Sequence, residues 1–300
     1  MPGHPCAEAS KNVCSWTKSE WPSRYQRKLS YHSGVSLKFE NRPSLVAYLT
    51  CGDPDLRTTR EVALAAISAG AEIIELGVPF SDPVADGPVI QRASERALKN
   101  GVCLDEVLGV AAEIRNESTA GLIVFSYLNP ILRMGVEKFA AQAADAGADG
   151  ALVIDLPVEE AGEYRRHMRN RNLATVFLAA PTSPDERLKH IAEASTGFVY
   201  AVSRTGVTGA RKELPEDAEK LVHRLRRFTK LPIAVGFGIS APEQFAAVGA
   251  FAEAAVVGSA IVRTIETNPG TEAKAVAEFI KQLIGRHPLR RSASQGVVGR

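Results

Sequence analysis

The 300-residue sequence is poor in cysteine, in net charge and in long apolar runs, and each shortage excludes a class of protein. Its four cysteines stand at spacings that match no zinc-binding pattern, so we expect free thiols in a cytoplasmic protein and no metal site. A formal net charge of +2 gives no field that would attract nucleic acid or another polyanion. No apolar run approaches the roughly 18 residues that a membrane span needs. The start of the chain also lacks the apolar core of a secretory signal.

The two ends of the chain lack the hydrophobic periodicity of the middle. Residues 1–43 are rich in Ser, Lys, Arg, Trp and Tyr without a sustained period of 2 or 3.6 residues, and we expect an atypical, poorly ordered extension there. A basic N-terminus with serines also suits an organellar transit peptide, although the glutamates of this segment argue against one. Residues 286–300 are basic and lack acids, which favours a flexible tail over a nucleic-acid-binding arm.

The middle of the chain, residues 44–285, repeats one pattern: a helix end at Ala-Gly, a short turn with an acid, and a buried apolar strand. AGAEIIELGVP (69–79) is echoed by AGADGALVIDLP (146–157) and, more loosely, by GAFAEAAVVGSA (249–260). Strands that are apolar on both faces and alternate with helical stretches are typical of parallel sheets. We expect eight strands, at 44–49, 72–76, 122–127, 150–156, 175–179, 198–202, 233–237 and 254–258. Eight β/α units predict an α/β fold, a single-domain (β/α)8 TIM barrel; a doubly wound sheet is the alternative, since counting strands cannot show closure.

Carboxylates stand at the strand ends where a barrel carries its chemistry. Glu75 interrupts the apolar end of the second predicted strand, and Asp86 follows in a proline-rich loop. Asp155 ends the fourth predicted strand. Taken alone, Glu75 has a structural alternative as a buried acid paired with a barrel lysine. Asp82, in the same loop as Asp86, is equally suited to a turn or an N-cap.

Glycines close the last three predicted strands and predict a phosphate site. GFG (236–238) and GS (258–259) each stand between a strand and a helix, and SRTGVTGA (203–210) follows the sixth strand. Glycine lets backbone N–H groups approach an anion, and a helix N-terminus favours negative charge. One such glycine is usually turn chemistry, but three such loops together predict phosphate binding. The candidate residues are Gly209, Gly236, Gly238, Gly258 and Ser259.

The motifs YLTCGDP, ELGVPFSDPVADGPVIQ, DLPVEE, SRTGVTG and GFGIS, taken in order, resemble the tryptophan synthase alpha subunit family over about residues 43–285. The resemblance implies a carbon–carbon lyase that cleaves indole-3-glycerol phosphate to indole and glyceraldehyde 3-phosphate in the last steps of tryptophan biosynthesis. It also implies a tryptophan synthase beta subunit as partner in an alpha2beta2 heterotetramer. Pyridoxal phosphate is then expected only in the beta subunit, and no cofactor in this chain.

The same resemblance assigns roles to the two acids. Glu75 would be the acid and base that exchanges protons with indole C3 and the neighbouring hydroxyl, and Asp86 would accept the indole N–H. A carboxyl in an apolar strand end should have a raised pKa that suits proton transfer near neutral pH. A loop carboxylate in a more polar setting should stay ionised and stabilise positive charge.

The resemblance further implies a pocket for a flat aromatic substrate, although its apolar members could equally be core residues. The residues that it assigns to substrate binding are Tyr48, Phe125, Tyr127, Leu152, Tyr200, Thr208 and Phe237. Thr208 would lie on a lid loop after the sixth strand, Asp155 would belong to the network near the substrate, and Asp82 would contact the beta subunit or support its loop.

Three other functions are compatible with parts of the pattern. Another phosphate-binding barrel enzyme, such as an indoleglycerol phosphate synthase or a sugar phosphate isomerase, would share the late glycines, but a synthase needs a catalytic lysine that predicted strands 1 to 4 lack. A free-standing indole-releasing lyase would differ only in its independence of a partner, and a non-catalytic binding protein would not need both acids. One departure from the family is clear: SGVSLKFENRPSLV offers little of the short helix that usually lies under the barrel floor.

Overall fold

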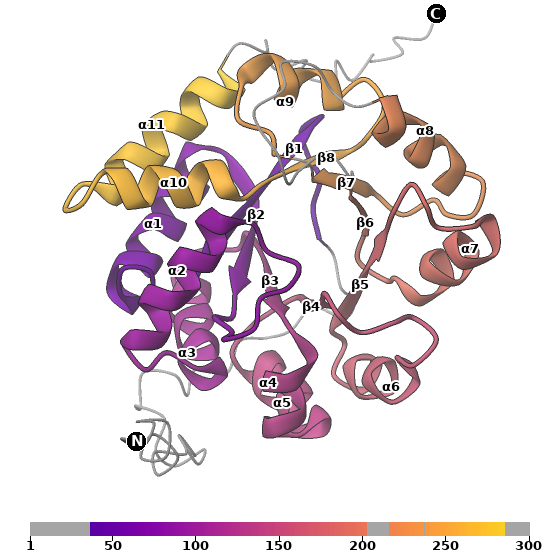
Figure 1. Ribbon diagram of the computed structural model, residues 1–300, viewed down its shortest axis with the longest axis horizontal. Coiled ribbons are helices and arrows are strands. Elements are labelled where there is room, and N and C mark those ends of the chain that lie inside the picture. The colour runs from indigo at the N-terminus through magenta and orange to yellow at the C-terminus, as the bar shows by residue number, and fades with distance from the viewer. Residues whose placement is uncertain (1–36, 203–215, 237, 286–300) are drawn as a thin grey trace, which may run out of the picture.

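The computed structural model describes residues 37–202, 216–236 and 238–285, and within them eight parallel strands close into a barrel surrounded by helices (Figure 1). The strands are β1 (Ser44–Thr50), β2 (Ala71–Gly77), β3 (Gly121–Ser126), β4 (Gly150–Val153), β5 (Ala174–Ala179), β6 (Val199–Val202), β7 (Ile233–Gly236) and β8 (Ala254–Val257). The helices are α1 (Leu56–Ala69), α2 (Pro88–Lys99), α3 (Leu104–Arg115), α4 (Leu128–Met134), α5 (Val136–Asp145), α6 (Gly162–Asn170), α7 (Asp185–Ala194), α8 (Glu216–Leu225), α9 (Pro242–Val248), α10 (Ser259–Thr267) and α11 (Glu272–Ile284). Each strand pairs with the next and β8 pairs with β1, which confirms the TIM barrel and excludes the doubly wound sheet.

The predicted strands and the observed strands differ at their ends. The fourth strand stops at Val153, so Asp155 lies in the loop beyond it instead of at its end. The seventh strand stops at Gly236, and Phe237 lies outside the described residues. None of the helices in the described ranges is long and apolar enough to cross a membrane.

The Ala-Gly pairs of the repeat end helices, as the sequence predicts. Gly70 follows α1 with a φ of 117°, and Gly147 follows α5 with a φ of 78°. Both are left-handed conformations that glycine adopts without the steric cost of a Cβ. The third, looser repeat has no such pair, since Val248 stands before Gly249, and Gly249 at the end of α9 has a φ of −60°.

Two apolar clusters follow from the alternation of side chains along each strand. Leu45, Ala47 and Leu49 of β1 belong to the cluster between the barrel and the helices. Val46 and Tyr48 belong to the second cluster, which fills the inside of the barrel. Because successive strand residues point to opposite faces, most strands are buried on both sides and read as continuous apolar runs; in β6, Tyr200 and Val202 are only partly buried.

The acids of the repeat lie at the N-terminal end of the barrel, where they bind backbone N–H groups of neighbouring segments. Asp149 accepts a hydrogen bond from the N–H of Leu122 at the start of β3 (2.8 Å). Glu253 accepts one from the N–H of Ile233 at the start of β7 (2.9 Å). Glu72 accepts two backbone hydrogen bonds from the segment just before β1. These turn acids are therefore structural, in contrast to the acids at the opposite end.

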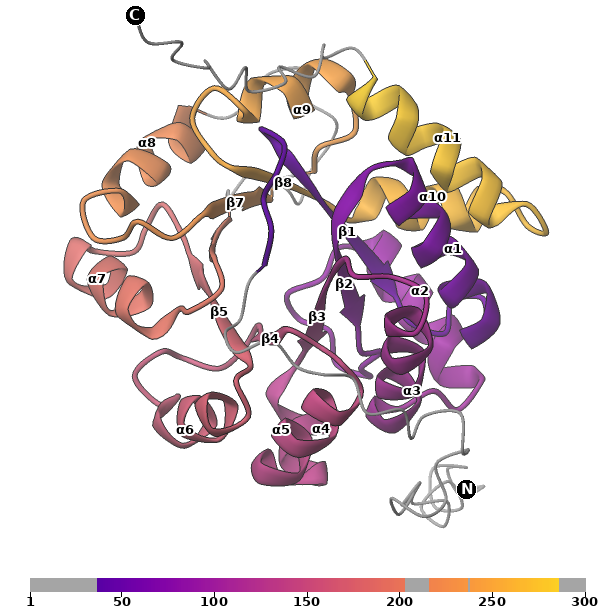
Figure 2. The same ribbon diagram turned by 180° about the vertical axis from the view of Figure 1, so that it is seen from behind.

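The segment before β1 fills the N-terminal opening of the barrel, where it crosses the end that Figure 2 shows. The rings of Phe39 and Phe198 meet edge to face with centroids 5.9 Å apart. Leu37 packs against Gly121 and Gly197, where an added Cβ on either glycine would come within 2.9 Å of a Leu37 methyl group. Two apolar side chains from an extended segment thus occupy the place where the resemblance implied a short helix.

These contacts bear on the boundaries of the domain. Residues 1–36 and 286–300 lie outside the described residues. Residues 37–43, which the sequence analysis assigned to the N-terminal extension, contact the barrel floor. We propose on this ground that the barrel unit begins near Leu37.

Candidate active site

Glu75 points into the barrel near the C-terminal end of β2. In the strand register it stands beside Tyr48 of β1 and Ile123 of β3, and its neighbours Ile74 and Leu76 point to the outer cluster. The side chain is 0% exposed, and neither carboxyl oxygen has a hydrogen-bond partner among the described residues. Burial alone raises its pKa to about 8. A carboxyl in this setting is protonated at neutral pH and can both donate and accept a proton near pH 7.

Asp86 lies at the end of the loop between β2 and α2, residues 78–87, which we call the catalytic loop. The hydroxyl of Tyr127 donates a hydrogen bond to Asp86 Oδ2 (3.1 Å) and accepts one from the N–H of Ala85 (3.0 Å). The amide of Gln91, in the first turn of α2, donates to the carbonyl oxygen of Asp86 (2.8 Å). The loop end is thereby held between β3 and α2.

The pKa of Asp86 is raised to about 6, because burial outweighs the hydrogen bond from Tyr127 that favours the ionised form. The surroundings of this carboxylate are thus less polar than the sequence suggested. The expected difference between the two acids still holds, since Asp86 is ionised at neutral pH while Glu75 is protonated.

Two tyrosines lean into the barrel mouth beside Glu75, each over a glycine of the next strand. Tyr48 pairs with Glu75 in the register, and a Cβ on Gly77, two residues further along β2, would come 2.3 Å from its hydroxyl oxygen. Tyr200 pairs with Ala234, and a Cβ on Gly236, two residues further along β7, would likewise come 2.3 Å from its hydroxyl oxygen. Neither the role of Gly77 nor the reason for Gly236 can be found in the sequence, because both depend on the register between strands.

Burial raises the pKa of both tyrosines, and the nearby charges of Glu75 and Asp86 raise it further. Both hydroxyls therefore stay protonated and act as hydrogen-bond donors at neutral pH. Because the charges of both acids act on both hydroxyls, the four side chains lie near one another at the mouth of the barrel.

Apolar and aromatic side chains lie around these four residues and form the walls of the candidate site. The rings of Tyr48 and Phe125 meet edge to face with centroids 5.2 Å apart, and Leu152 is buried in the same inner cluster. Phe80 of the catalytic loop lies against Tyr127, with centroids 4.9 Å apart and an angle of 30° between the rings. Such walls suit a flat aromatic ligand. Thr208, Gly209 and Phe237, also predicted for the site, lie outside the described residues.

The late glycines gather where β7 and β8 run side by side. Gly238 has a φ of 74° and open space where a Cβ would stand, and Gly258 forms the N-cap of α10, whose first residue is Ser259. Gly236 differs, because the ring of Tyr200 takes the space beside it. The open backbone at Gly238 and the N-terminus of α10 are suited to an anion.

Asp155 binds the backbone of the segment that follows β3. Its Oδ1 accepts a hydrogen bond from the N–H of Leu128 at the start of α4 (2.7 Å). This contact orients the end of β3, from which Tyr127 reaches Asp86.

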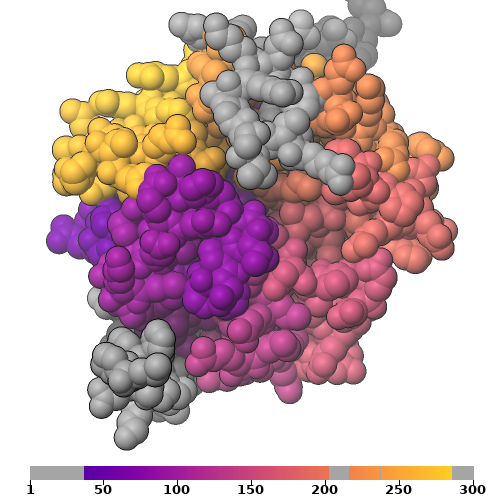
Figure 3. All heavy atoms as spheres, viewed as in Figure 1, coloured from indigo at the N-terminus to yellow at the C-terminus, as the bar shows by residue number. Residues whose placement is uncertain are grey.

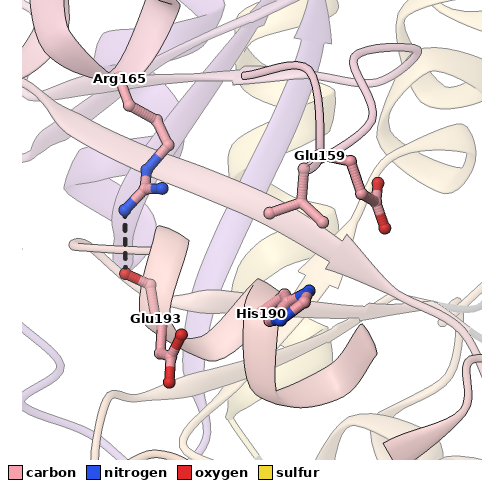
Figure 4. Close-up of a pocket in the computed structure, with 5 residues that line it drawn as sticks. Glu159, Arg165, His190 and Glu193 are labelled. Atoms are coloured by element: carbon pink, nitrogen blue, oxygen red, sulfur yellow. Dashed lines mark hydrogen bonds between the residues drawn. The ribbon is translucent and has the colours of Figure 1, made fainter. Parts of the chain in front are cut away.

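Two hollows lie on the outside of the barrel. One, between α6 and α7, is lined by Val158, Glu159, Arg165, His190 and Glu193, and Figure 4 shows Arg165 donating to the carbonyl oxygen of Glu193 (3.2 Å). Its lining comes from outer helices and a loop, and contains none of the inward-facing strand residues.

The second hollow lies over the outer side of the catalytic loop and α2, whose atoms form a raised part of the face seen in Figure 3. Its lining residues are Phe80, Ser81, Asp82, Pro83, Val84, Gln91, Glu95 and Leu98. Val84 is 88% exposed, which is unusual for a large apolar side chain.

The comparisons with known proteins agree with this geometry. A profile of the family "Tryptophan synthase alpha chain" matches residues 35–288. A tryptophan synthase alpha chain from Solibacter usitatus is 55% identical over 232 residues, 77% of this chain and 87% of that protein. One from Neisseria meningitidis serogroup B is 47% identical over 80% of this chain and 92% of that protein. Among solved structures, a tryptophan synthase complex from Pyrococcus furiosus superposes with a TM-score of 0.76 at 42% identity, covering 82% of this chain and 99% of that chain.

Proposed function

The chain belongs to the tryptophan synthase alpha chain family, whose reaction is the retro-aldol cleavage of indole-3-glycerol phosphate, and we propose that Glu75 and Asp86 carry out this reaction. The protein is accordingly a carbon–carbon lyase of tryptophan biosynthesis, and its products are indole and glyceraldehyde 3-phosphate. Members of the family need no cofactor for this step. The observation that carries our assignment is a fully buried Glu75 without a hydrogen-bond partner in the described residues, at the mouth of the barrel.

The first step is a proton transfer to indole C3. With a pKa of about 8, Glu75 carries its proton at neutral pH and is held by no protein acceptor in the described residues. Donation to C3 breaks the aromaticity of the ring and places positive charge on the indole nitrogen. The ionised carboxylate of Asp86 then stabilises that charge by accepting the indole N–H.

The second step breaks the carbon–carbon bond. The Glu75 carboxylate left by the first step removes the proton from the hydroxyl on the carbon attached to C3. The O–H electron pair forms the aldehyde C=O, and the pair of the broken bond returns to the ring and neutralises the nitrogen. Glu75 ends the cycle protonated, so that one residue serves both transfers. The hydroxyls of Tyr48 and Tyr200 lie beside Glu75. There they can donate hydrogen bonds to the oxygen atoms that carry negative charge between the two steps.

We assign the substrate phosphate to the end of β7 and the N-terminus of α10. Gly238 leaves its backbone open, and Gly258 and Ser259 begin the helix. A phosphate there would accept hydrogen bonds from backbone N–H groups and interact favourably with the helix dipole. The indole ring would then lie between the aromatic walls, with the reacting carbon over Glu75.

A tryptophan synthase beta subunit, with its own pyridoxal phosphate, is the partner that we propose, in an alpha2beta2 heterotetramer. Three large apolar side chains in the described residues are strongly exposed: Val84 at 88%, Leu132 at 57% and Leu98 at 36%. Val84 and Leu98 line the hollow over the catalytic loop, so a protein docked there would contact the segment that carries Asp86. Neither Cys51 nor Cys103 forms a disulfide within the described residues, which suits the cytoplasmic location that we propose for the assembly.

The catalytic assignment is tested by indole release from purified variants. Glu75→Gln and Asp86→Asn should each lower kcat by roughly 10²- to 10⁴-fold, because each removes a group that acts in the transition state. Asp82→Asn is the matched control, since Asp82 lies in the same loop but accepts only from the neighbouring Ser81 hydroxyl (2.6 Å) among the side-chain contacts described. Near wild-type turnover in Glu75→Gln would refute the assignment.

The second candidate function is a free-standing lyase. Dependence of its activity on a beta subunit distinguishes it from the function proposed above. We expect slow indole release by the isolated chain and faster release when a beta subunit is added, with formation of a complex in sedimentation. Full activity alone, without a complex, would favour the free-standing enzyme.

A further inference from the structure

An ion-pair network joins the loop after β1, helix α2 and helix α10 at the rim of the barrel mouth. Arg96 of α2 donates two hydrogen bonds to Asp53, from Nε to Oδ1 (2.7 Å) and from Nη2 to Oδ2 (2.9 Å). Its third nitrogen, Nη1, donates to Glu266 of α10 (2.9 Å). Arg92, one turn earlier, holds Glu266 by two more bonds (2.9 and 2.8 Å) but is not bonded to Asp53. Arg96 thus bridges two acids from segments that are far apart in the sequence.

The geometry is that of a fixed anchor. Asp53 is only 2% exposed, and both of its oxygens are taken by the planar fork of the guanidinium, which restrains orientation as well as distance. The two arginines lower the pKa of Glu266 to about 2. Glu266 and the two arginines therefore keep their charges throughout the pH range in which the enzyme would work.

Helix α2 carries this anchor to Asp86. Asp86 immediately precedes Gly87, the N-cap of α2, and Gln91 in the first turn binds the Asp86 carbonyl oxygen. Val89, in the same turn, packs into the inner cluster of the barrel. A rotation or shift of α2 therefore moves the backbone that places the Asp86 carboxylate.

Helix α10 carries the anchor to the proposed phosphate site. Glu266 lies near the C-terminal end of α10, and Ser259 begins the helix about 10 Å away. Helices α2 and α10 contact each other at the rim (Figure 1), and Val262 of α10 joins the inner cluster that receives Val89.

We propose that Arg96 is a positioning residue for the lyase reaction: it fixes the helix that places Asp86 against both the barrel wall and the helix whose N-terminus receives the phosphate. The role rests on the catalytic assignment of Asp86 made above. The distance between the Asp86 carboxylate and the phosphate site at α10 is then fixed. One substrate molecule can place its indole at the first and its phosphate at the second.

The test is a double-mutant comparison. Arg96→Gln should lower kcat for indole release by roughly 10- to 100-fold, since a displacement of about 1 Å at a catalytic group has an effect of this size. The affinity for glycerol 3-phosphate, measured by calorimetry, should change much less. In an Asp86→Asn background the same substitution should change the residual rate by no more than about twofold, because the group that it positions is already gone.

Two variants separate positioning from a general loss of structure. Arg92→Gln removes the same charge from the same helix and also weakens the hold on Glu266, but it leaves the bonds to Asp53, so kcat should stay within about twofold of wild type. Because Arg96→Gln leaves a buried charge unpaired, the paired variant Asp53→Asn with Arg96→Gln serves as the neutral counterpart. It should keep a thermal midpoint close to wild type and still show the loss of kcat.

The outcomes are distinct. Equal factors of loss for Arg96→Gln in the wild-type and Asp86→Asn backgrounds, or recovery of wild-type kcat in the paired variant, would overturn the positioning role and leave the catalytic pair intact. An equal loss in Arg92→Gln would also overturn it. Full activity in Asp86→Asn itself would instead overturn the assignment of Asp86, and this proposal with it.

Discussion

Replacing Glu75 by Gln should stabilise the fold in a pH-dependent way while it removes activity. Burial raises the pKa of this carboxyl from an ordinary 4.5 to about 8, and neither oxygen has a partner in the described residues. In the unfolded chain the carboxyl ionises freely above its ordinary value. The folded state must therefore hold a proton that the unfolded state has lost.

The sign and size of the effect follow from this difference. A group whose folded pKa is raised contributes its full stability below the unfolded pKa, and that contribution is lost as the pH rises toward the folded pKa. Each pH unit between 4.5 and 8 corresponds to about 1.4 kcal/mol, so wild type should lose about 3 kcal/mol between pH 4.5 and pH 7 through Glu75. The amide introduced by Glu75→Gln does not titrate, so the variant escapes this loss, although a buried amide with an unpaired donor costs about 1–3 kcal/mol at every pH.

The assay is urea and thermal unfolding of wild type and Glu75→Gln at pH 5.5, 6.5 and 7.5. The variant's advantage over wild type should grow by about 2.7 kcal/mol across this range, or about 5–10 °C in the thermal midpoint of a barrel of this size. The matched control is Glu72→Gln on the same strand, because Glu72 accepts hydrogen bonds from the segment before β1 and should lose stability when replaced. A difference between Glu75→Gln and wild type that stays constant with pH would refute the reasoning.

Three further predictions concern the candidate active site and the outer surface beside it. Since Glu75 acts while protonated and Asp86 while ionised, kcat/KM for indole release should fall below about pH 6 and above about pH 8, and Asp86→Asn should lose the acid limb of this profile. Gly236→Ala should lower kcat for indole release by displacing Tyr200, because the new Cβ would come within 2.8 Å of the hydroxyl oxygen and of two ring carbons; unchanged kcat would contradict this role of the glycine. Leu98→Asp should leave the isolated rate unchanged but weaken acceleration by a beta subunit, measured by titrating the partner into the indole-release assay.

The fold was predictable because every repeat unit has the same pattern, an apolar strand followed by a helix. A strand that is apolar on both faces must be covered on both, and a parallel sheet with helices outside does this. The Ala-Gly pairs mark where α1 and α5 stop, and Gly70 and Gly147 adopt the conformation that they predict. Closure was the one step that counting strands did not give, since it depends on the pairing of Ser44 with Ala254 across the two ends of the chain.

The two acids of the site were predictable because each is a charged residue in an unusual sequence context. Glu75 interrupts an apolar strand, and Asp86 ends a loop that is rich in proline. The partners that tune them were not, because Tyr127 reaches Asp86 from a different strand and no spacing in the sequence indicates that contact. The pairing of Arg96 with Asp53 is invisible for the same reason, since 43 residues separate them and each has an ordinary local role as a helix or turn residue.

The floor of the barrel shows the opposite limit. The sequence before β1 lacks a helical period and offers little of the short helix that the resemblance implies there. The structure instead uses Leu37 and Phe39 from an extended segment. Two side chains suffice because Gly121 and Gly197 leave space at the strand starts, and a pattern search for a helix does not detect such a fit.

Glu72 and Glu75 show most directly how one strand separates stability from chemistry. The two residues are of the same type and lie three positions apart on β2, at opposite ends of the barrel. Glu72 receives hydrogen bonds from two backbone groups, from the amide of Asn41 and from the hydroxyl of Ser44, so its charge is satisfied and holds the floor together. Glu75 receives none from the described residues, so its charge is unfavourable and its proton is exchangeable near neutral pH. A partner for Glu75 that improved stability would lower its pKa and remove the proton that the first step of the reaction needs. The missing hydrogen bonds are therefore a requirement of the mechanism, and the well-bonded acids at the other end of the barrel are what allow the fold to tolerate them.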